Sequence, residues 1–448
     1  MLRGSILKPR IINSAKSFFS SQAPAAQDSG SLKLSQLNNG LKVVTANQGA
    51  YGARIALLVK SGSRNDESPG LTHCLQATAG LTNNTNTAFL TTQLLSSLGA
   101  ELEVIAGRDS ILYQVGCHPN VAKDILVDVL APVVFGGKYQ WWEVKDVAAR
   151  MKYQKALAES DPCFVLMETA HKASFAGKFG SPILCPDYLL GSHTTEMLTS
   201  RLNSEFTASN MVLAGTGVSQ DALIDAAMSL ENLSSGSVEK PSVPSFVSSE
   251  AHVVTPGELV HGAISFPGLA LNNENCIALS VLQHALGSTS SIKRSSGLKH
   301  GVLNSAVDRA TNAIFNTSAF SINYSDCGLF GVHVVAQKSD FSKVVQATAA
   351  ECSKIALSGI PSDAVEGAKQ RLKAKIIMGS ENSAQTVENV AVQTAVLGTV
   401  AEPSKICQMI DGITAQQVAG VAKQVLGGKK SFATVGDCLD TPRLQDIL

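Results

Sequence analysis

The sequence predicts an α+β protein with two related domains. Its 448 residues are too many for one ordinary hydrophobic core and suit two domains of about 200 residues each. Strand-like and helix-like segments are mixed without the regular alternation of a βαβ fold. Two segments in different halves of the chain also share one pattern, which indicates an ancestral domain that was copied.

The N-terminal half supplies both kinds of element in turn. A tight-turn signal, Asn38-Asn39-Gly40, separates two strand-like runs within 31–48. Further predicted strands cover 55–59, 111–115 and 211–215, and predicted helices cover 71–79, 91–98, 120–134, 141–159 and 163–175.

The repeated pattern is an amphipathic helix, a short polar turn and a short apolar strand that ends in glycine. It covers 195–217 and 414–436, which align without gaps at an offset of 219 residues. A weaker echo links Leu75-Gln76 with Leu282-Gln283 at an offset of 207. The two similar offsets indicate a single duplication of one domain.

The domain boundaries follow from a change in composition near the middle of the chain. Residues 231–250 hold seven serines and two prolines, which is typical of an extended linker. We therefore expect an N-terminal domain over 31–230 and a C-terminal domain over 251–448.

The first thirty residues differ from the rest. They carry four basic residues and several serines, and no acidic residue precedes Asp28. Broken apolar runs lie between the basic residues. This pattern is typical of a mitochondrial transit peptide, which we assign to 1–24; a disordered basic tail is the alternative.

Composition excludes some classes of function. The chain has 36 basic and 36 acidic residues and only 5% aromatic residues, so nucleic-acid binding has no electrostatic support. Charged residues make up only 16%, which indicates either a large core or a surface partly covered by partners. Nine scattered cysteines without a CxxC motif favour free thiols over disulfides. Downstream of the leader no stretch is apolar enough to span a bilayer, so membrane association would come through partners.

Common catalytic motifs are missing from the sequence. Neither a GxSxG nucleophile elbow nor a GxxxxGK[ST] phosphate loop is present. The nine histidines are never closer than nine residues. This spacing excludes a zinc pair at i and i+4 of one helix but leaves open a site assembled from distant histidines.

One segment is nonetheless similar to a zinc motif. After a strand that ends at Ser61-Gly62-Ser63-Arg64, a helix carries His73, Cys74, Leu75, Gln76 and Ala77 in sequence. This arrangement resembles the inverted motif HxxEH of the pitrilysin/mitochondrial processing peptidase family, written here as HxxQA. In the working motif the two histidines hold Zn²⁺ and the glutamate takes a proton from the bound water.

The resemblance implies that this chain lacks the zinc site. Gln76 has no proton-accepting carboxylate, and Ala77 has no lone pair for a metal. The third ligand of the family should lie about 75 to 80 residues further on, where Gln154 and Leu157 occur, and Glu159 is the nearest carboxylate. A catalytic zinc needs three protein ligands. We therefore expect no catalytic residue, no metal and no cofactor at the degenerate motif, and a structural role for His73.

The resemblance extends over nearly the whole chain beyond the leader. The family has homologous α/β-sandwich domains, each with a mixed, mostly antiparallel sheet and helices packed on it. The runs that carry a narrower similarity are Arg108-Asp109 with Tyr113, Trp142-Glu143-Val144, Cys185-Pro-Asp-Tyr188, Leu282-Gln283-His284-Ala285-Leu286-Gly287, Tyr324-Ser-Asp-Cys-Gly-Leu-Phe-Gly331 and Arg371-Leu372-Lys373-Ala374.

These runs are similar to the non-catalytic core subunits that the family contributes to the respiratory bc1 complex. The resemblance implies a structural subunit on the matrix side of the mitochondrial inner membrane. Its partners would be a homologous core subunit, cytochrome b, cytochrome c1 and the iron–sulfur protein. The alternative is the non-catalytic peptide-binding subunit of the processing peptidase, which carries a glycine-rich loop where this chain has the serine-rich stretch 286–297.

Overall fold

A computed structural model provides the structure of the chain. It describes residues 32–46, 52–228, 236, 242–288, 301–311, 313–437 and 441–447. The predicted transit peptide at 1–24 lies outside the described residues, as do residues 231–235 and 237–241 of the predicted linker and residues 289–297 of the serine-rich stretch.

The N-terminal half forms a six-stranded sheet. Its strands in spatial order are β1 (Leu32–Gln36), β2 (Lys42–Ala46), β6 (Met211–Thr216), β3 (Ala53–Val59), β5 (Ile111–Cys117) and β4 (Glu101–Ala106). β2 and β6 run parallel, and all other neighbours run antiparallel. The predicted turn between β1 and β2 is present, with Gly40 at φ 93°, a conformation that glycine adopts without a steric penalty.

The C-terminal half forms a five-stranded sheet. Its strands in spatial order are β7 (Glu250–Val254), β11 (Ser431–Gly436), β8 (Leu259–Pro267), β10 (Gly328–Gln337) and β9 (Phe315–Asn323). β7 and β11 run parallel, and the other neighbours run antiparallel. Without β1, the first sheet has the same order and the same directions, so the predicted duplication and the mixed, mostly antiparallel sheets are confirmed.

The helices of the first half include those that the sequence predicted. They are α1 (Leu71–Thr78), α2 (Ala88–Ser97), α3 (Ala122–Ile125), α4 (Ala131–Phe135), α5 (Trp141–Glu159), α6 (Pro162–Ser174), α7 (Thr195–Glu205) and α8 (Gln220–Met228), with short 3₁₀ turns at Ser63–Asn65, Pro119–Val121, Gly177–Gly180, Asp187–Leu189 and Ala208–Asn210. The predicted helix at 120–134 is interrupted by a π-helical turn at Leu126–Leu130, between α3 and α4.

The second half adds its own set of helices. They are α9 (Cys276–Leu286), α10 (Val302–Ala310), α11 (Lys338–Ser358), α12 (Ser362–Ser380), α13 (Ser383–Leu397), α14 (Pro403–Asp411), α15 (Ala415–Leu426) and α16 (Leu444–Ile447). Among the described residues, no helix has the length and apolar character needed to cross a membrane.

The repeated helix–turn–strand unit is present in both halves, but at an offset of 220 residues. Thr194 caps α7 as Thr414 caps α15, and β6 starts at Met211 as β11 starts at Ser431. The sequence alignment was shifted by one residue because it matched two glycines that are not equivalent. One of them follows its strand, whereas the other is the last residue of its strand.

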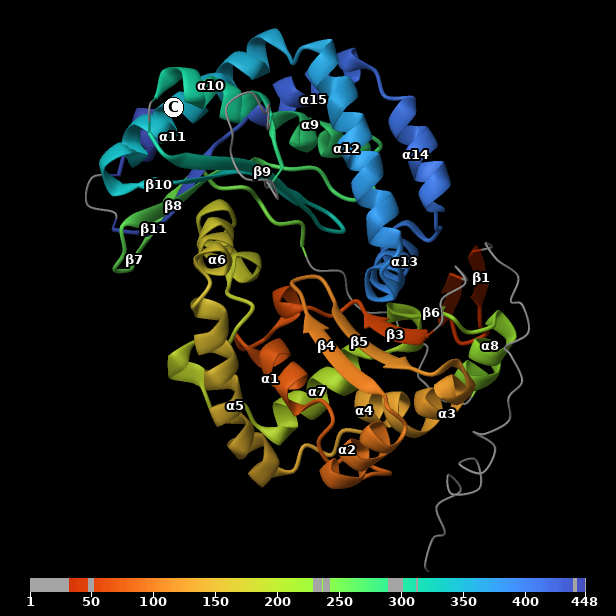
Figure 1. The fold of residues 1–448 in the computed structure, drawn as a ribbon. Coiled ribbons are helices and arrows are strands. Elements are labelled where there is room, and N and C mark those ends of the chain that lie inside the picture. The colour runs from red at the N-terminus through yellow and green to blue at the C-terminus, as the bar shows by residue number, and fades with distance from the viewer. Residues whose placement is uncertain are drawn as a thin grey trace, which may run out of the picture.

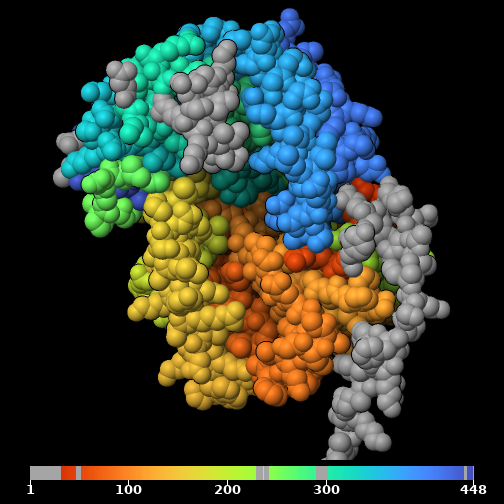
Figure 2. Space-filling model, in the orientation of Figure 1, coloured from red at the N-terminus to blue at the C-terminus, as the bar shows by residue number. Residues whose placement is uncertain are grey.

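Each half lends one helix to the sheet of the other half. α6 packs on β7, β8 and β11 of the second sheet, and α13 packs on β2, β3 and β6 of the first. Figure 1 shows α6 (yellow) below the second sheet and α13 (blue) above the first. Both helices lie where the two lobes of the space-filling view meet (Figure 2). The two sheets are therefore joined by an exchange of helices.

This exchange explains why β3 is apolar over most of its length. In β3, Ile55 and Leu57 contribute to the core on the side of α1, and Ala56 and Leu58 contribute to the core that includes α13. A strand that is buried on both faces needs a nearly continuous run of apolar side chains, as the segment ARIALLV provides.

Candidate functional site

The segment that precedes α1 determines how closely this helix packs against its neighbours. The carboxylate of Asp66 accepts hydrogen bonds from the backbone N–H (3.1 Å) and the hydroxyl (2.5 Å) of Thr72. Gly70 lies at φ 88°, and a Cβ at this position would come within 2.5 Å of Cys185. Only glycine lets the two backbones approach so closely. The result is that α1 lies directly against the segment that contains Cys185.

Burial changes the pKa of Asp66. Desolvation raises the pKa of this carboxyl to about 6, although the hydrogen bonds from Thr72 and the positive charge of Arg201 act in the opposite direction. The guanidinium of Arg201 lies 3.5 Å from Asp66 and also donates to Ser61 Oγ and to the carbonyl of Gly62. These contacts tie the loop to α7.

Both ring nitrogens of His73 are occupied by contacts within the protein. The side chain is 1% exposed. The backbone N–H of Cys185 donates to Nδ1 at 3.2 Å, so Nδ1 is an acceptor and the proton is on Nε2. Nε2 lies 3.1 Å from Oε1 of Gln154, to which it donates. Desolvation lowers the pKa of His73, which keeps the ring neutral.

The next two motif positions are also used structurally. Nε2 of Gln76 donates to the carbonyl of Val104 in β4 at 2.8 Å. Ala77 is fully buried, and its carbonyl accepts a hydrogen bond from Arg150 at 3.0 Å. Gln76 therefore fastens α1 to the edge of the sheet, and Ala77 allows α5 to pack closely against α1.

Of the residues considered for the third ligand, the structure brings one to His73. Gln154 faces His73 from α5, whereas the side chain of Leu157 is 62% exposed. Glu159 lies near the end of α5 and pairs with Lys155 at 3.6 Å. Of the positions considered from the sequence, His73 and Gln154 meet. Nothing in the spacing alone could choose between Gln154 and Leu157.

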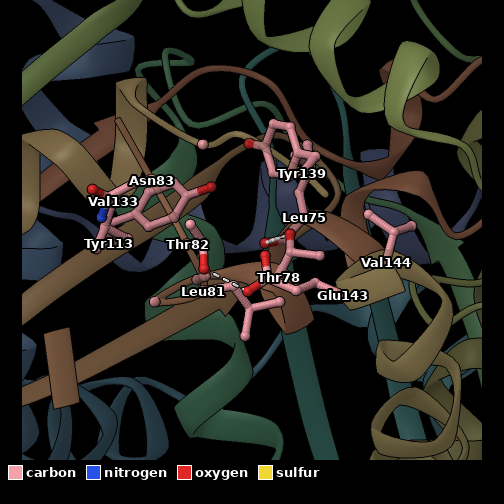
Figure 3. A pocket seen from close by; sticks show the side chains of 13 residues that line it. Leu75, Thr78, Leu81, Thr82, Asn83, Tyr113, Val133, Tyr139, Glu143 and Val144 are labelled. Carbon is pink, nitrogen blue, oxygen red and sulfur yellow. Dashed lines mark hydrogen bonds between the residues drawn. The ribbon is translucent and has the colours of Figure 1, made fainter. Parts of the chain in front are cut away.

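A small cavity lies beside this site, between α1 and α5 (Figure 3). Its volume is about 10 Å³, which is the room for one water molecule at most. The hydroxyl of Thr82 donates to Glu143 Oε1 at 2.5 Å, and the buried Oε2 has no partner among the described residues. The cavity is too small for a peptide substrate.

Two of the sequence runs that carry the family resemblance, Arg108-Asp109 and Tyr324 to Gly331, meet between the two halves of the chain. Arg64 contacts Asp109 at 2.8 Å and binds both carboxylate oxygens of Asp326, at 2.9 and 2.6 Å. Asp109 also accepts a hydrogen bond from the backbone N–H of Ser325 at 2.7 Å. The guanidinium lies 5.1 Å from the ring centre of Phe179. These runs therefore hold the two sheets together.

Comparison with known proteins agrees with this geometry. Residues 42–187 match the family described as Insulinase (Peptidase family M16), and residues 193–372 match the Peptidase M16 inactive domain. The chain is 32% identical to the human protein named Cytochrome b-c1 complex subunit 2, mitochondrial, over 95% of this chain and 93% of the human one. It is 27% identical to Mitochondrial-processing peptidase subunit alpha-2 of Dictyostelium discoideum, over 92% and 93%.

The fold and the site define the class. The protein is a two-domain α+β relative of the M16 peptidases. The chain belongs to peptidase family M16.

Proposed function

We propose that this chain is a non-catalytic structural core subunit of the mitochondrial cytochrome bc1 complex, equivalent to subunit 2 (core protein 2). It supports assembly of ubiquinol–cytochrome c reductase and thereby electron transfer from ubiquinol to cytochrome c. The single observation that carries this proposal is the 32% identity to the human subunit 2 over 95% of this chain. The hydrogen bond between His73 and Gln154 supports the non-catalytic part of the proposal.

The chemistry of the site explains why the subunit is not a peptidase. Zinc lowers the pKa of its bound water to about 7 and so supplies a nucleophile at neutral pH. A catalytic zinc needs three protein ligands, and the amide of Gln154 and the methyl group of Ala77 replace two of them. Gln76 cannot accept the proton that the working glutamate takes. Neither the nucleophile nor the base can form at this position.

The surface of α5 supports a role inside a larger assembly. Trp142, Tyr153 and Leu157 are 49%, 69% and 62% exposed. Their spacing of 11 and 4 residues places them on one side of the helix. Exposed apolar residues grouped on one face are typical of an interaction surface. We expect a homologous core subunit (core protein 1) and the redox subunits cytochrome b, cytochrome c1 and the iron–sulfur protein as partners in the complex.

The cellular placement follows from the same assignment. The subunit would lie on the matrix side of the inner membrane, as a peripheral protein held by its partners. Residues 1–24 would direct import and then be removed. Residues 31–230 and 251–448 would be the two duplicated domains, joined by 231–250. Because α6 and α13 are exchanged, each domain needs the other to cover its sheet.

The peptide-binding subunit of the processing peptidase is the second candidate. The Dictyostelium and Arabidopsis thaliana alpha subunits are 27% and 26% identical to this chain, below the 32% of the human bc1 subunit. A non-catalytic site fits both candidate functions. The complex in which the chain is found must therefore distinguish between them.

Blue-native electrophoresis of detergent-solubilised mitochondria, with an affinity tag on the C-terminus of this chain, tests the assignment. We expect the tagged chain to migrate with cytochromes b and c1 and to be depleted from that band when the bc1 complex fails to assemble. Recovery in a soluble two-chain particle that cleaves presequence peptides would contradict the proposal and favour the second candidate.

A further inference from the structure

Three potential metal ligands converge where α6 meets the second sheet. They are Cys163 in the first turn of α6, His261 in β8 and His333 in β10. One ligand atom from each lies within 4.8 Å of the others. The residues are 98 and 72 positions apart in the sequence, so only the exchange of α6 onto the second sheet brings them together. This cluster is separate from the degenerate motif on α1.

The two histidines face the same side of the sheet. In the antiparallel ladder of β8 and β10, His261 is opposite Val335 and His333 is opposite Ala263. Opposite residues point to one face, and so do residues two apart on a strand. Ala263 belongs to the cluster that α6 covers. The imidazoles therefore point toward the helix that carries Cys163.

The distance between the rings matches the spacing of two ligands on one metal ion. Nδ1 of His261 lies 3.3 Å from Nε2 of His333. Two nitrogens bound tetrahedrally to Zn²⁺ at about 2.0–2.1 Å are separated by about 3.3 Å. The sulfur of Cys163, an exposed residue, lies within 4.8 Å of a ring nitrogen of each histidine.

An acidic side chain lies next to the cluster and favours a bound cation. Asp161 caps α6 by accepting the backbone N–H of Cys163 at 2.9 Å. Its carboxylate adds a negative charge beside the cluster.

We propose that Cys163, His261 and His333 bind one Zn²⁺ ion, with a water molecule in the fourth position. Two imidazoles and a thiolate are a donor set that zinc prefers. On binding, the thiol of Cys163 releases its proton to solvent as the sulfur–zinc bond forms. The ion would fasten α6 of the first half to β8 and β10 of the second half.

Cobalt substitution in the purified full-length chain tests this site directly. We expect one Co²⁺ per chain, with the visible absorption of a tetrahedral ion and a thiolate-to-cobalt charge-transfer band. Zn²⁺ should displace it. C163S should remove the charge-transfer band, and H333Q should weaken metal binding at least about tenfold. The matched controls C407S and H118Q should behave like the wild type.

Two results would overturn the proposal. One is a wild-type chain that binds no cobalt. The other is C163S and H333Q proteins that bind it as the wild type does, which would leave the histidines as a hydrogen-bonded pair without a metal. The readout is spectroscopic and uses no peptidase or electron-transfer assay, so its outcome is independent of the assignment to the bc1 complex.

Discussion

The two exchanged helices perform the same task with different chemistry. α13 covers the first sheet through aliphatic contacts, in which Val387, Val390 and Ala391 pack with strand residues of β2, β3 and β6. α6 covers the second sheet with a mixed surface. There His171 hydrogen-bonds the hydroxyl of Tyr324 at 2.7 Å, and Ser174 hydrogen-bonds Ser431 at 2.6 Å. The contact beside α6 also includes the Arg64 ion pairs.

This difference shows how a duplicated domain can become asymmetric. The aliphatic contact depends mainly on area and shape, so it should respond less to pH and salt than the contact made by α6. The contact made by α6 depends on hydrogen bonds and charges whose geometry must be kept. It should therefore be the more specific of the two contacts and also the one that fails first when a partner group is removed.

Arg64→Ala should have the largest effect on this comparison. The guanidinium is only 5% exposed and holds two carboxylates, so its removal leaves Asp109 and Asp326 without their counter-ion. Breaking a buried ion pair from one side costs about 3–5 kcal/mol. Denaturant unfolding of the full chain measures the loss. Lys123→Ala, which removes an exposed pair with Asp225, should change the stability by less than about 1 kcal/mol. If Arg64→Ala and Lys123→Ala lost equal amounts of stability, the distinction between a buried and an exposed ion pair would be contradicted.

Val387→Ala should have the next largest effect on stability. Val387 is 1% exposed in the core beneath α13. Removing its methyl groups loses burial and leaves a cavity, at a cost of about 2 kcal/mol. The loss should be the same at pH 7 and pH 5.5. Leu357→Ala, at a position that is 89% exposed, is the control and should be close to neutral. A loss that depends on pH would show that the aliphatic contact is not purely apolar.

His171→Gln should reveal the pH dependence of the α6 contact. Burial, followed by the charge of Arg108, lowers the pKa of His171 to about 3. The unfolded chain takes up a proton near pH 6.5, whereas the folded chain does not. Stability from this group is therefore complete above pH 6.5 and falls by about 1.4 kcal/mol for each pH unit below it.

The difference in unfolding free energy between wild type and His171→Gln should thus shrink by about 1.4 kcal/mol between pH 7 and pH 5.5. Denaturant titrations at the two pH values measure it. Asp66, whose raised pKa gives the opposite dependence between about pH 4 and pH 6, is common to both proteins and cancels in the difference. A difference that does not change with pH would show that His171 is protonated or not buried in the folded chain.

Gln76→Ala should have the smallest effect. It removes the hydrogen bond to Val104 in β4, which is worth about 1 kcal/mol. If Gln76 acts only as a structural anchor, the variant should lose this stability and show no other change. A larger loss would mean that β4 depends on α1 more than one hydrogen bond implies.

The sequence predicted the local elements better than their partners. The turn at Gly40 and the helix at 141–159 follow from residue types that act over a few positions, and the structure has both. β4 was missed because the alternation of charged and apolar residues that marks a strand covers only four of its six residues, Glu101 to Val104. The exchange of α6 and α13 could not be predicted, since no periodicity says which sheet an apolar helix will cover.

For the candidate site, too, the sequence predicted the local chemistry but not the contacts between distant residues. That Gln76 and Ala77 cannot serve zinc follows from their side chains alone. That Gln154 is the partner of His73, and that the N–H of Cys185 occupies the second ring nitrogen, depends on contacts across 81 and 112 residues. Spacing likewise left open a site of distant histidines, and only the fold brings His261 and His333 beside Cys163.

Hydrolysis of a presequence peptide by the purified full-length chain, with Zn²⁺ added, tests the central claim most directly. Because His73 and Gln154 satisfy each other and no base replaces Gln76, we expect a rate equal to that of buffer with zinc. Hydrolysis above this background that disappears in His73→Ala would contradict the account.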